Sequence, residues 1–388
     1  MTTLTNLDAI ILGGGPAGSA AAIELALSGR RVALIERSTA AHDKVCGDFL
    51  STEALSSLNN LGLNLSALGA VPIHNIRLAG SLGVSSTTLP FAAQSLTRRT
   101  LDEALLERAA SAHALVLRGH IAESLHRNDN LWRVHITGPN HAYALSAPHI
   151  VLATGKHDLR GLPRPLLGTH ADLVGLKMYL RLAPDQLAEL RDTIELFLIP
   201  GGYGGLSLVE TNAANLCFVI QRKFLRDAGR GWDALAALLN KTPHLRARLA
   251  EAEPLLPRPL AISPIPYGLL RRHAIAENLW AIGDQAAVIP SFTGDGLALA
   301  LHSGRFAAHT ILARKSAHQF HSELHKQLRH QLSLATILSR GLVSQPQRAF
   351  LELGACLFPS ALRAVASHTR LPSQYLVPRL PKSSCAPA

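Results

Sequence analysis

The sequence is short of cysteine, of long apolar runs and of any pattern that would ligate a metal. Its four cysteines have neither disulfide nor zinc-site spacing, which favours free thiols in a cytoplasm: Cys46, Cys217, Cys356 and Cys385. Asp284 and Asp295 interrupt the longest apolar candidate, and no basic segment followed by an apolar run opens the chain. We therefore predict neither a transmembrane helix nor a secretion signal. The 19 histidines are scattered, and no metal site is expected.

Acidic residues are scarce in the last quarter of the chain. From residue 301 onward there are eleven Lys and Arg but only Glu323 and Glu352, so this part carries +9 of the net charge of +11. A basic, solvated helical surface is the simpler interpretation. The alternative is a docking surface for an acidic carrier protein or for anionic lipid headgroups at a membrane. A nucleic acid is disfavoured, because stacking aromatics do not alternate with these cations.

What the sequence does contain is a glycine-rich turn between an apolar strand and a helix. Residues 9–12 predict a strand that runs into Gly13-x-Gly15-x-x-Gly18, and an Ala-rich helix follows to Ser28. A second strand at 32–35 ends on Glu36. Such a turn lets the backbone approach a pyrophosphate, the helix N-terminus attracts the phosphates, and the acid accepts hydrogen bonds from a ribose. The arrangement predicts a dinucleotide site.

A second glycine motif lies far downstream. Residues 278–296 predict a strand ending in Gly283-Asp284, then a loop through Pro290, then a helix start at Gly294-Asp295-Gly296. One carboxylate can bind a ribityl hydroxyl, and a helix N-terminus can stabilise a reduced flavin ring. The motif favours a flavin over a nicotinamide as the bound dinucleotide.

Together the two motifs resemble those of the FAD-dependent oxidoreductases that unite the group A aromatic hydroxylases with the geranylgeranyl reductases. The resemblance implies that Glu36 binds the adenosine ribose, that Asp284 binds the ribityl chain and that the 294–296 backbone contacts the isoalloxazine. Arg99-Thr-Leu-Asp102 resembles the Arg-x-x-Asp of the family near the cofactor phosphates. At 150–155 the family usually has a strand ending in Asp-Gly, and here Thr154 replaces that Asp. The cofactor-binding set implied is Gly13, Gly15, Pro16, Ala17, Gly18, Glu36, Arg37, Lys44, Cys46, Gly47, Arg99, Thr154, Gly155, Gly283, Asp284, Pro290, Gly294, Asp295 and Gly296.

The segment Lys44-Val-Cys46-Gly47-Asp48 follows the second strand. It resembles the Lys-x-Cys-Gly-Asp of geranylgeranyl reductases, and still more a Cys-Gly-Glu-Phe-Leu-Ser variant in bacterial oxidoreductases of polyketide pathways. The resemblance implies that Lys44 binds the pyrophosphate. Cys46 is a catalytic candidate, as a proton donor or gate near the isoalloxazine, and the alternative is a buried apolar filler.

Tyr203 is the second catalytic candidate. It lies in a glycine-rich segment, 201–205, for which we expect a β-turn near the site. The segment resembles the Pro-x-x-Tyr-x-Trp of geranylgeranyl reductases, but Gly205 stands where the Trp belongs, which weakens the case for a long prenyl substrate. Tyr203 either lines the substrate pocket or packs on its own hairpin.

The resemblance implies an α/β fold with a Rossmann-like FAD-binding domain of the glutathione-reductase type, an inserted β-sheet substrate domain and C-terminal helices. We assign residues 1–70, 93–165 and 270–320 to the first domain, 71–92 and 166–269 to the second, 321–370 to the helices and 371–388 to a disordered tail. The expected activity is NAD(P)H-dependent monooxygenation of a hydrophobic, aromatic or polyketide-derived small molecule. One alternative is reduction of a C=C bond or dehydrogenation, and another is a flavoprotein that docks on a carrier or membrane. NADPH or NADH would bind without a Rossmann unit of its own.

Overall fold

A parallel sheet forms around the N-terminal strand in the computed structural model, which describes residues 7–166, 169–170, 172–229 and 231–378. The sheet has five strands in the order β17-β10-β1-β2-β6, and neighbouring strands are parallel. Their bounds are β1 (Ala9–Leu12), β2 (Val32–Glu36), β6 (Leu115–Arg118), β10 (His149–Leu152) and β17 (Leu279–Ala281). Parallel strands of this kind are apolar throughout because both faces of the sheet are covered.

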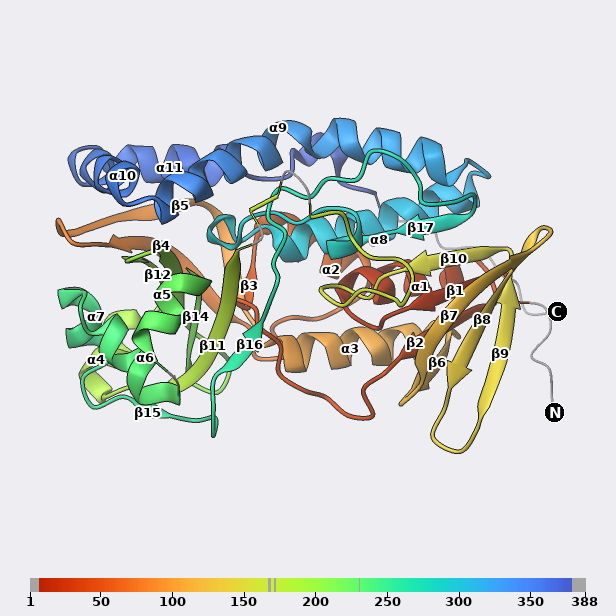
Figure 1. Ribbon diagram of the computed structural model, residues 1–388, viewed down its shortest axis with the longest axis horizontal. Coiled ribbons are helices and arrows are strands. Elements are labelled where there is room, and N and C mark those ends of the chain that lie inside the picture. The colour runs from red at the N-terminus through yellow and green to blue at the C-terminus, as the bar shows by residue number, and fades with distance from the viewer. Residues whose placement is uncertain (1–6, 167–168, 171, 230, 379–388) are drawn as a thin grey trace.

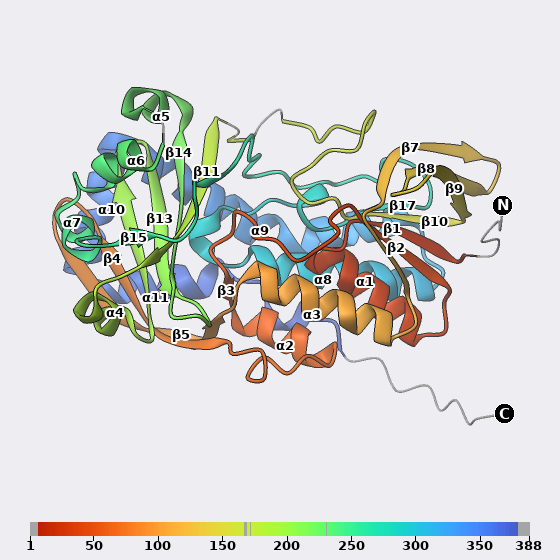
Figure 2. The same cartoon turned by 90° about the horizontal axis from the view of Figure 1, so that it is seen from below.

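Alternate residues of β1 point to the two covering layers. Ile11 packs with helices α1 (Pro16–Leu27), α3 (Arg98–Ser111) and α8 (Gly296–Leu312). Ile10 and Leu12 pack instead against a three-stranded antiparallel sheet, β7 (Ile121–Asn128), β8 (Leu131–Thr137) and β9 (Ala142–Ala147). Figure 2 shows α1 and α3 side by side on one face of the parallel sheet and β7–β9 on the other. The alternation follows from the two-residue period of a strand.

The second lobe is built on a nine-stranded mixed sheet. Seven of its strands are β4 (Val71–Ala79), β5 (Val84–Ser95), β11 (Leu173–Arg181), β12 (Thr193–Ile199), β13 (Gly202–Leu208), β14 (Ala214–Gln221) and β16 (Leu260–Ile262). The short strands β3 (Phe49–Leu50) and β15 (Glu253–Pro254) lie at its two ends. Helices α4 (Pro184–Leu190), α5 (Arg222–Ala228), α6 (Gly231–Leu239) and α7 (Pro243–Arg248) surround it, and leucines of α6 and α7 join its core. Since β3 belongs to the N-terminal 70 residues, that segment contributes to both lobes.

Long helices connect the two lobes. Helix α2 (Thr52–Asn60) packs on α8, and α9 (Ala317–Val343) runs across the top of the molecule in Figure 1. Helices α10 (Gln345–Leu357) and α11 (Pro359–His368) lie at the substrate-lobe end, beside the β4–β5 hairpin. A Ser316–Gln319 capping box fixes the start of α9. Among the described helices, none combines the length and the hydropathy that a membrane crossing needs.

The expected α/β class with a Rossmann-like domain, an inserted sheet and C-terminal helices is confirmed. Three local expectations were wrong. The sequence pattern over 232–250 predicts one helix, but the segment is interrupted at residues 240–242, before Pro243, and gives α6 and α7. Residues 202–205 belong to strand β13, so the expected β-turn is confined to the residues before it.

The third correction concerns the tail expected to be disordered, 371–388. Residues 371–378 pack on the FAD-binding lobe, with Leu371 and Val377 buried. Arg305 of α8 donates hydrogen bonds to the Val377 and Pro378 carbonyls, and this side chain is itself fixed by Glu24. Residues 379–388 lie outside the described part of the chain.

Candidate functional site

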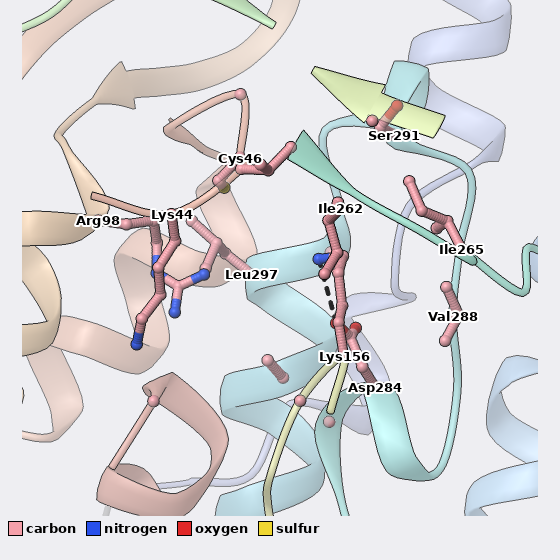
Figure 3. A pocket seen from close by; sticks show the side chains of 18 of the residues that line it. Lys44, Cys46, Arg98, Lys156, Ile262, Ile265, Asp284, Val288, Ser291 and Leu297 are labelled. Carbon is pink, nitrogen blue, oxygen red and sulfur yellow. Dashed lines mark ion pairs between the residues drawn. The ribbon is translucent and has the colours of Figure 1, made fainter. Parts of the chain in front are cut away.

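A cavity of about 610 Å³ runs between the two lobes. The first glycine turn and Glu36 form one end, and the Lys44–Gly47 loop, Thr154, Asp284 and the start of α8 form the middle. The other end is apolar, with side chains from the second sheet, from the 262–292 segment and from α11: Ile76, Leu89, Phe91, Leu196, Phe218, Ile262, Ile265, Val288, Phe292, Leu362 and Val365. Figure 3 shows the middle of the cavity, around Lys44, Cys46 and Asp284.

The first glycine turn has no room for side chains. Gly13 has a φ of +112°, and a Cβ there would collide with the Ala153 carbonyl, so only glycine fits between β1 and β10. A Cβ at Gly18 would overlap the Gly13 carbonyl, which explains the close approach of α1 to the turn. Gly15 is the N-cap of α1 and lines the cavity. The free amides of this helix start therefore face the cavity, where they can bind phosphate.

Glu36 is held in place by the backbone around it. Its carboxylate accepts hydrogen bonds from the Gly14 amide at 2.8 Å and from the Ser38 amide at 2.8 Å. Burial raises the pKa of Glu36, but these amides and the nearby Lys44 outweigh burial and lower it. The group is therefore an anion at neutral pH at the edge of the cavity, as an acceptor for ribose hydroxyls must be.

Two cations share one carboxylate beside the turn. Arg98 donates to both oxygens of Asp102, at 2.7 and 2.8 Å, and Lys44 donates to the same carboxylate at 2.7 Å. Burial opposes the charge of Arg98, but Asp102 outweighs burial and raises its pKa. The structure thus places Arg98 in the cavity. Arg99, which the sequence suggested, lies outside it, mostly exposed and 3.8 Å from Asp43.

Asp284 lies in a short 3-10 turn directly after β17 and pairs with Lys156 at 3.2 Å (Figure 3). Nearby, the buried hydroxyl of Thr154 has no hydrogen-bond partner among the described residues. Added Cβ atoms at Gly47, Gly155 and Gly296 would meet nothing within 4 Å. An open space flanked by a carboxylate and an unpaired hydroxyl fits a polar, ring-bearing ligand such as FAD.

The Lys44–Asp48 segment is fixed from behind by a buried polar network. Asp48 is fully buried, with a φ of +55°, and pairs with the equally buried Lys177 of β11 at 2.5 Å. Tyr179 and Asn215 also donate to this carboxylate, at 2.9 and 3.0 Å. Burial raises the pKa of Asp48, against the opposing effect of Lys177. The network ties the Lys44–Asp48 segment to the nine-stranded sheet of the second lobe.

Cys46 lies on the cavity side of this network. Its carbonyl accepts from Asn215 at 3.1 Å, and the Asp48 amide donates to its sulfur at 3.4 Å. A second thiol, Cys217 of β14, also lines the cavity, and desolvation raises its pKa to about 12. Cys217 is therefore a neutral wall residue, whereas Cys46 lies on the Lys44–Gly47 loop that forms the middle of the cavity.

Tyr203 lines the apolar part of the cavity from β13. Its ring packs edge-on against Phe292, and its hydroxyl is 3.0 Å from that of Ser339 on α9. Burial raises the pKa of Tyr203 well above its usual value, so the hydroxyl stays neutral. The position agrees with a pocket wall, and the hydrogen bond to α9 gives it a packing role as well.

Most of the cofactor-binding residues expected from the sequence line this one cavity. The exceptions are Gly18, Arg99, Pro290 and Asp295. Asp295 is fully buried and binds Ser51, Arg370 and the Leu371 amide, so it fixes the C-terminal segment against α8. Sequence reasoning missed Arg98, Lys156 and Lys177. An i,i+4 Arg–Asp spacing could have indicated Arg98, but no local signal marked the two lysines.

Comparisons with known proteins agree with this geometry. The family described as FAD binding domain matches residues 6–170. Menaquinone reductase of Mycobacterium tuberculosis (strain H37Rv) is 26% identical over 82% of this chain and 79% of its own length. Digeranylgeranylglycerophospholipid reductase 2 of Methanosphaera stadtmanae is 26% identical over 77% of this chain and 76% of its own length.

Solved structures share the fold at low identity. A geranylgeranyl bacteriochlorophyll reductase-like protein of Thermoplasma acidophilum has a TM-score of 0.73 at 18% identity, covering 96% of this chain and 94% of its own. A flavin-dependent brominase has a TM-score of 0.75 at 15% identity, covering 96% of each chain. Reductases and halogenating enzymes thus share one scaffold, and the fold alone does not separate their chemistries.

Proposed function

We propose that this chain, which is similar to FAD-dependent oxidoreductases of the group A flavoprotein superfamily, reduces a carbon–carbon double bond in a lipophilic, isoprenoid-type substrate. The observation that carries the proposal is the position of Cys46. Its loop lies where the flavin end of the cavity meets the apolar wall, and a buried network holds it there. The names of the relatives that match four-fifths of the chain, reductases of lipids, support the same branch.

In the proposed reaction the chain provides binding, orientation and one proton. Glu36 and the first glycine turn would hold the adenosine end of FAD, Lys44 and Arg98 would bind the phosphates, and Asp284 with the start of α8 would hold the flavin end. In its reduced form the cofactor would supply the hydride for one alkene carbon. The Cys46 thiol gives its proton to the other carbon as the π bond breaks, and the thiolate then takes a proton from water. The apolar wall orients the alkene and excludes water.

The electrons must come from an external donor. We propose NADPH or NADH, which would bind in the open cavity, since the sequence has no second dinucleotide motif. Reduction by dithionite bypasses this step, so the donor can be tested separately from the substrate.

Monooxygenation, which the sequence favoured, is the competing outcome. The test starts from FAD-loaded protein reduced with one equivalent of dithionite without oxygen, to which a geranylgeranyl lipid without a quinone ring is added in detergent. We expect the visible absorbance of oxidised flavin to return and the product to gain two hydrogen atoms by mass spectrometry. A flavin that reoxidises only with dioxygen and yields an oxygenated product would refute the reductase assignment.

Cys46→Ala tests the proton donor, with Cys217→Ala as the matched cavity control. We expect Cys46→Ala to keep its FAD and to slow substrate reduction by about 100-fold or more, as for the loss of a general acid. Cys217→Ala should reduce substrate at close to the normal rate. Equal rates for Cys46→Ala and the unchanged protein would show that Cys46 donates no proton and only fills space in the cavity wall.

A further inference from the structure

One end of the molecule exposes an unusual number of large apolar side chains. On α10 and directly after it, Phe350 is 81% exposed, Leu357 62% and Phe358 63%. Leu353 of α10 is also exposed. Proteins that remain monomeric in water seldom gather such side chains at one place unless the place binds something. We call this group, Phe350, Leu353, Leu357 and Phe358, the α10 face.

The side of α10 opposite the α10 face packs on the β4–β5 hairpin. Phe350, Leu353 and Leu357 recur at the spacing of one helix face, while Glu352 points the other way. The Glu352 carboxylate accepts hydrogen bonds from the amide and the hydroxyl of Ser81, at the tip of the hairpin. This contact fixes the hairpin against α10, which lies beside it in Figure 1. Leu82 and Val84, both exposed, follow Ser81 directly.

The two helices at this end, α10 and α11, carry more cations than acids. Their one acid is Glu352, whose carboxylate is buried against the hairpin. Their cations are Arg348 of α10 and Arg363 of α11. Apolar side chains among cations complement a surface that is apolar inside and anionic at its rim.

We propose that the α10 face docks the protein on the surface of an anionic lipid bilayer. Phe350, Leu357 and Phe358 insert among the acyl chains near the headgroups, and the surrounding cations contact the phosphates. An acidic carrier protein would use the cations but leave three large apolar side chains in water. The lipid surface satisfies both properties at once.

The apolar end of the cavity lies close to the α10 face. Helix α11 begins directly after Phe358, and its Leu362 and Val365 line the apolar end of the cavity together with Leu89 and Phe91 of β5. The substrate end therefore lies beside the α10 face. This step rests on the proposed function: a lipid substrate would pass from the bilayer into the cavity along α11, without crossing water.

Vesicle binding tests the docking surface without any turnover. FAD-loaded, full-length protein is sedimented with vesicles of phosphatidylcholine alone or of phosphatidylcholine mixed with phosphatidylglycerol. We expect binding to the anionic vesicles that weakens as salt is raised. The affinity of the double variant Phe350→Ser/Leu357→Ser for these vesicles should be lower by a factor of about ten or more, because two large apolar side chains no longer enter the interface.

The matched control is Leu27→Ser/Leu131→Ser, which removes two exposed apolar side chains from α1 and β8 of the other lobe, outside the cavity. It should bind vesicles as the unchanged protein does, and all variants should keep their FAD. Equal binding by the α10 variant, or no binding of the unchanged protein to anionic vesicles, would overturn the proposal. A dimer in solution that the α10 variant loses, without vesicle binding, would assign the face to a second copy of the chain. Each of these failures leaves the anaerobic reduction experiment unaffected.

Discussion

Replacing Lys177 by Met should destabilise the protein more than any surface change. The substitution removes the cation that lies 2.5 Å from the Asp48 carboxylate and leaves that carboxylate without a charge partner in a site closed to water. Breaking one partner of a buried ion pair typically costs about 3–5 kcal/mol. The remaining donors, which are Tyr179, Asn215 and the Arg98 backbone amide, are neutral and offset only part of this cost.

The size of the effect on melting temperature follows from the chain length. An unfolding entropy of about 2.1 cal/mol/K per residue over 388 residues gives roughly 0.8 kcal/mol/K if the chain melts as one unit. A loss of about 3–5 kcal/mol then lowers Tm by about 4–6 °C. Calorimetry of the FAD-loaded protein measures the shift, and the bound FAD is quantified in the same samples.

The double variant Asp48→Asn/Lys177→Met separates the lost charge pair from the lost packing. It buries no charge, so we expect it to recover at least half of the decrease in Tm. The deficit of Lys177→Met should also shrink as the pH falls. Burial raises the pKa of Asp48, and a raised carboxyl pKa favours the folded state at low pH, where the group is protonated. A decrease below about 1 °C for Lys177→Met, or no recovery in the double variant, would refute this account.

The remaining predictions concern the cofactor site and the substrate lobe. Glu36→Gln should purify with little FAD, because a neutral amide replaces the anion that the surrounding donors stabilise; the ratio of flavin to protein absorbance measures the loss, and normal occupancy would contradict the ribose role. Asp284→Ala should likewise lose FAD while its far-ultraviolet circular dichroism stays unchanged, and full FAD content would exclude the ribityl role. Glu195, fully buried, has its pKa lowered to about 2, since His244 and Arg248 outweigh the effect of burial. A lowered carboxyl pKa contributes stability above about pH 4.5, and this contribution is lost as the pH falls toward 2. The Tm of Glu195→Gln should therefore fall less steeply between these pH values than the Tm of the unchanged protein. An equally steep fall would contradict the role of the Glu195 charge.

The two glycine motifs could be predicted from the sequence because their demands are local. Gly13 must have a positive φ beside another backbone, and Glu36 must end the next strand, so the residues themselves indicate the turn. The expected cation came from an Arg-x-x-Asp spacing, which selects Arg99, whereas the side chain that pairs with Asp102 is that of Arg98 at the i,i+4 spacing. Neighbouring residues of a helix point in different directions, so this difference of one residue moved the expected cation from the cavity to the surface.

The parts that could not be predicted depend on distant segments. Lys177 and Asp48 are 129 positions apart, and a lysine in a strand is ordinarily expected to face water. The cationic C-terminal region was recognised by its composition alone. The composition does not indicate the α10 face, because the contact between Glu352 and Ser81 decides which side of α10 remains exposed. Exposure is a property of the tertiary structure and has no local signature in these residues.

The strand order of the cofactor sheet has a consequence for biosynthesis. Strand β1 leaves the ribosome first, but its neighbour β10 follows some 140 positions later and β17 another 130, as the pairings of Ile10 with Ile150 and of Ile150 with Leu279 record. The β11–β14 meander, in contrast, pairs strands that are close in sequence. The parallel sheet therefore cannot be completed until the substrate lobe has been synthesised, and in that interval the edge of β1 that pairs with β10 lacks its partner strand. Asp284 and the start of α8, which border the cavity, follow later still, so the complete site for FAD forms only after about three quarters of the chain has been made.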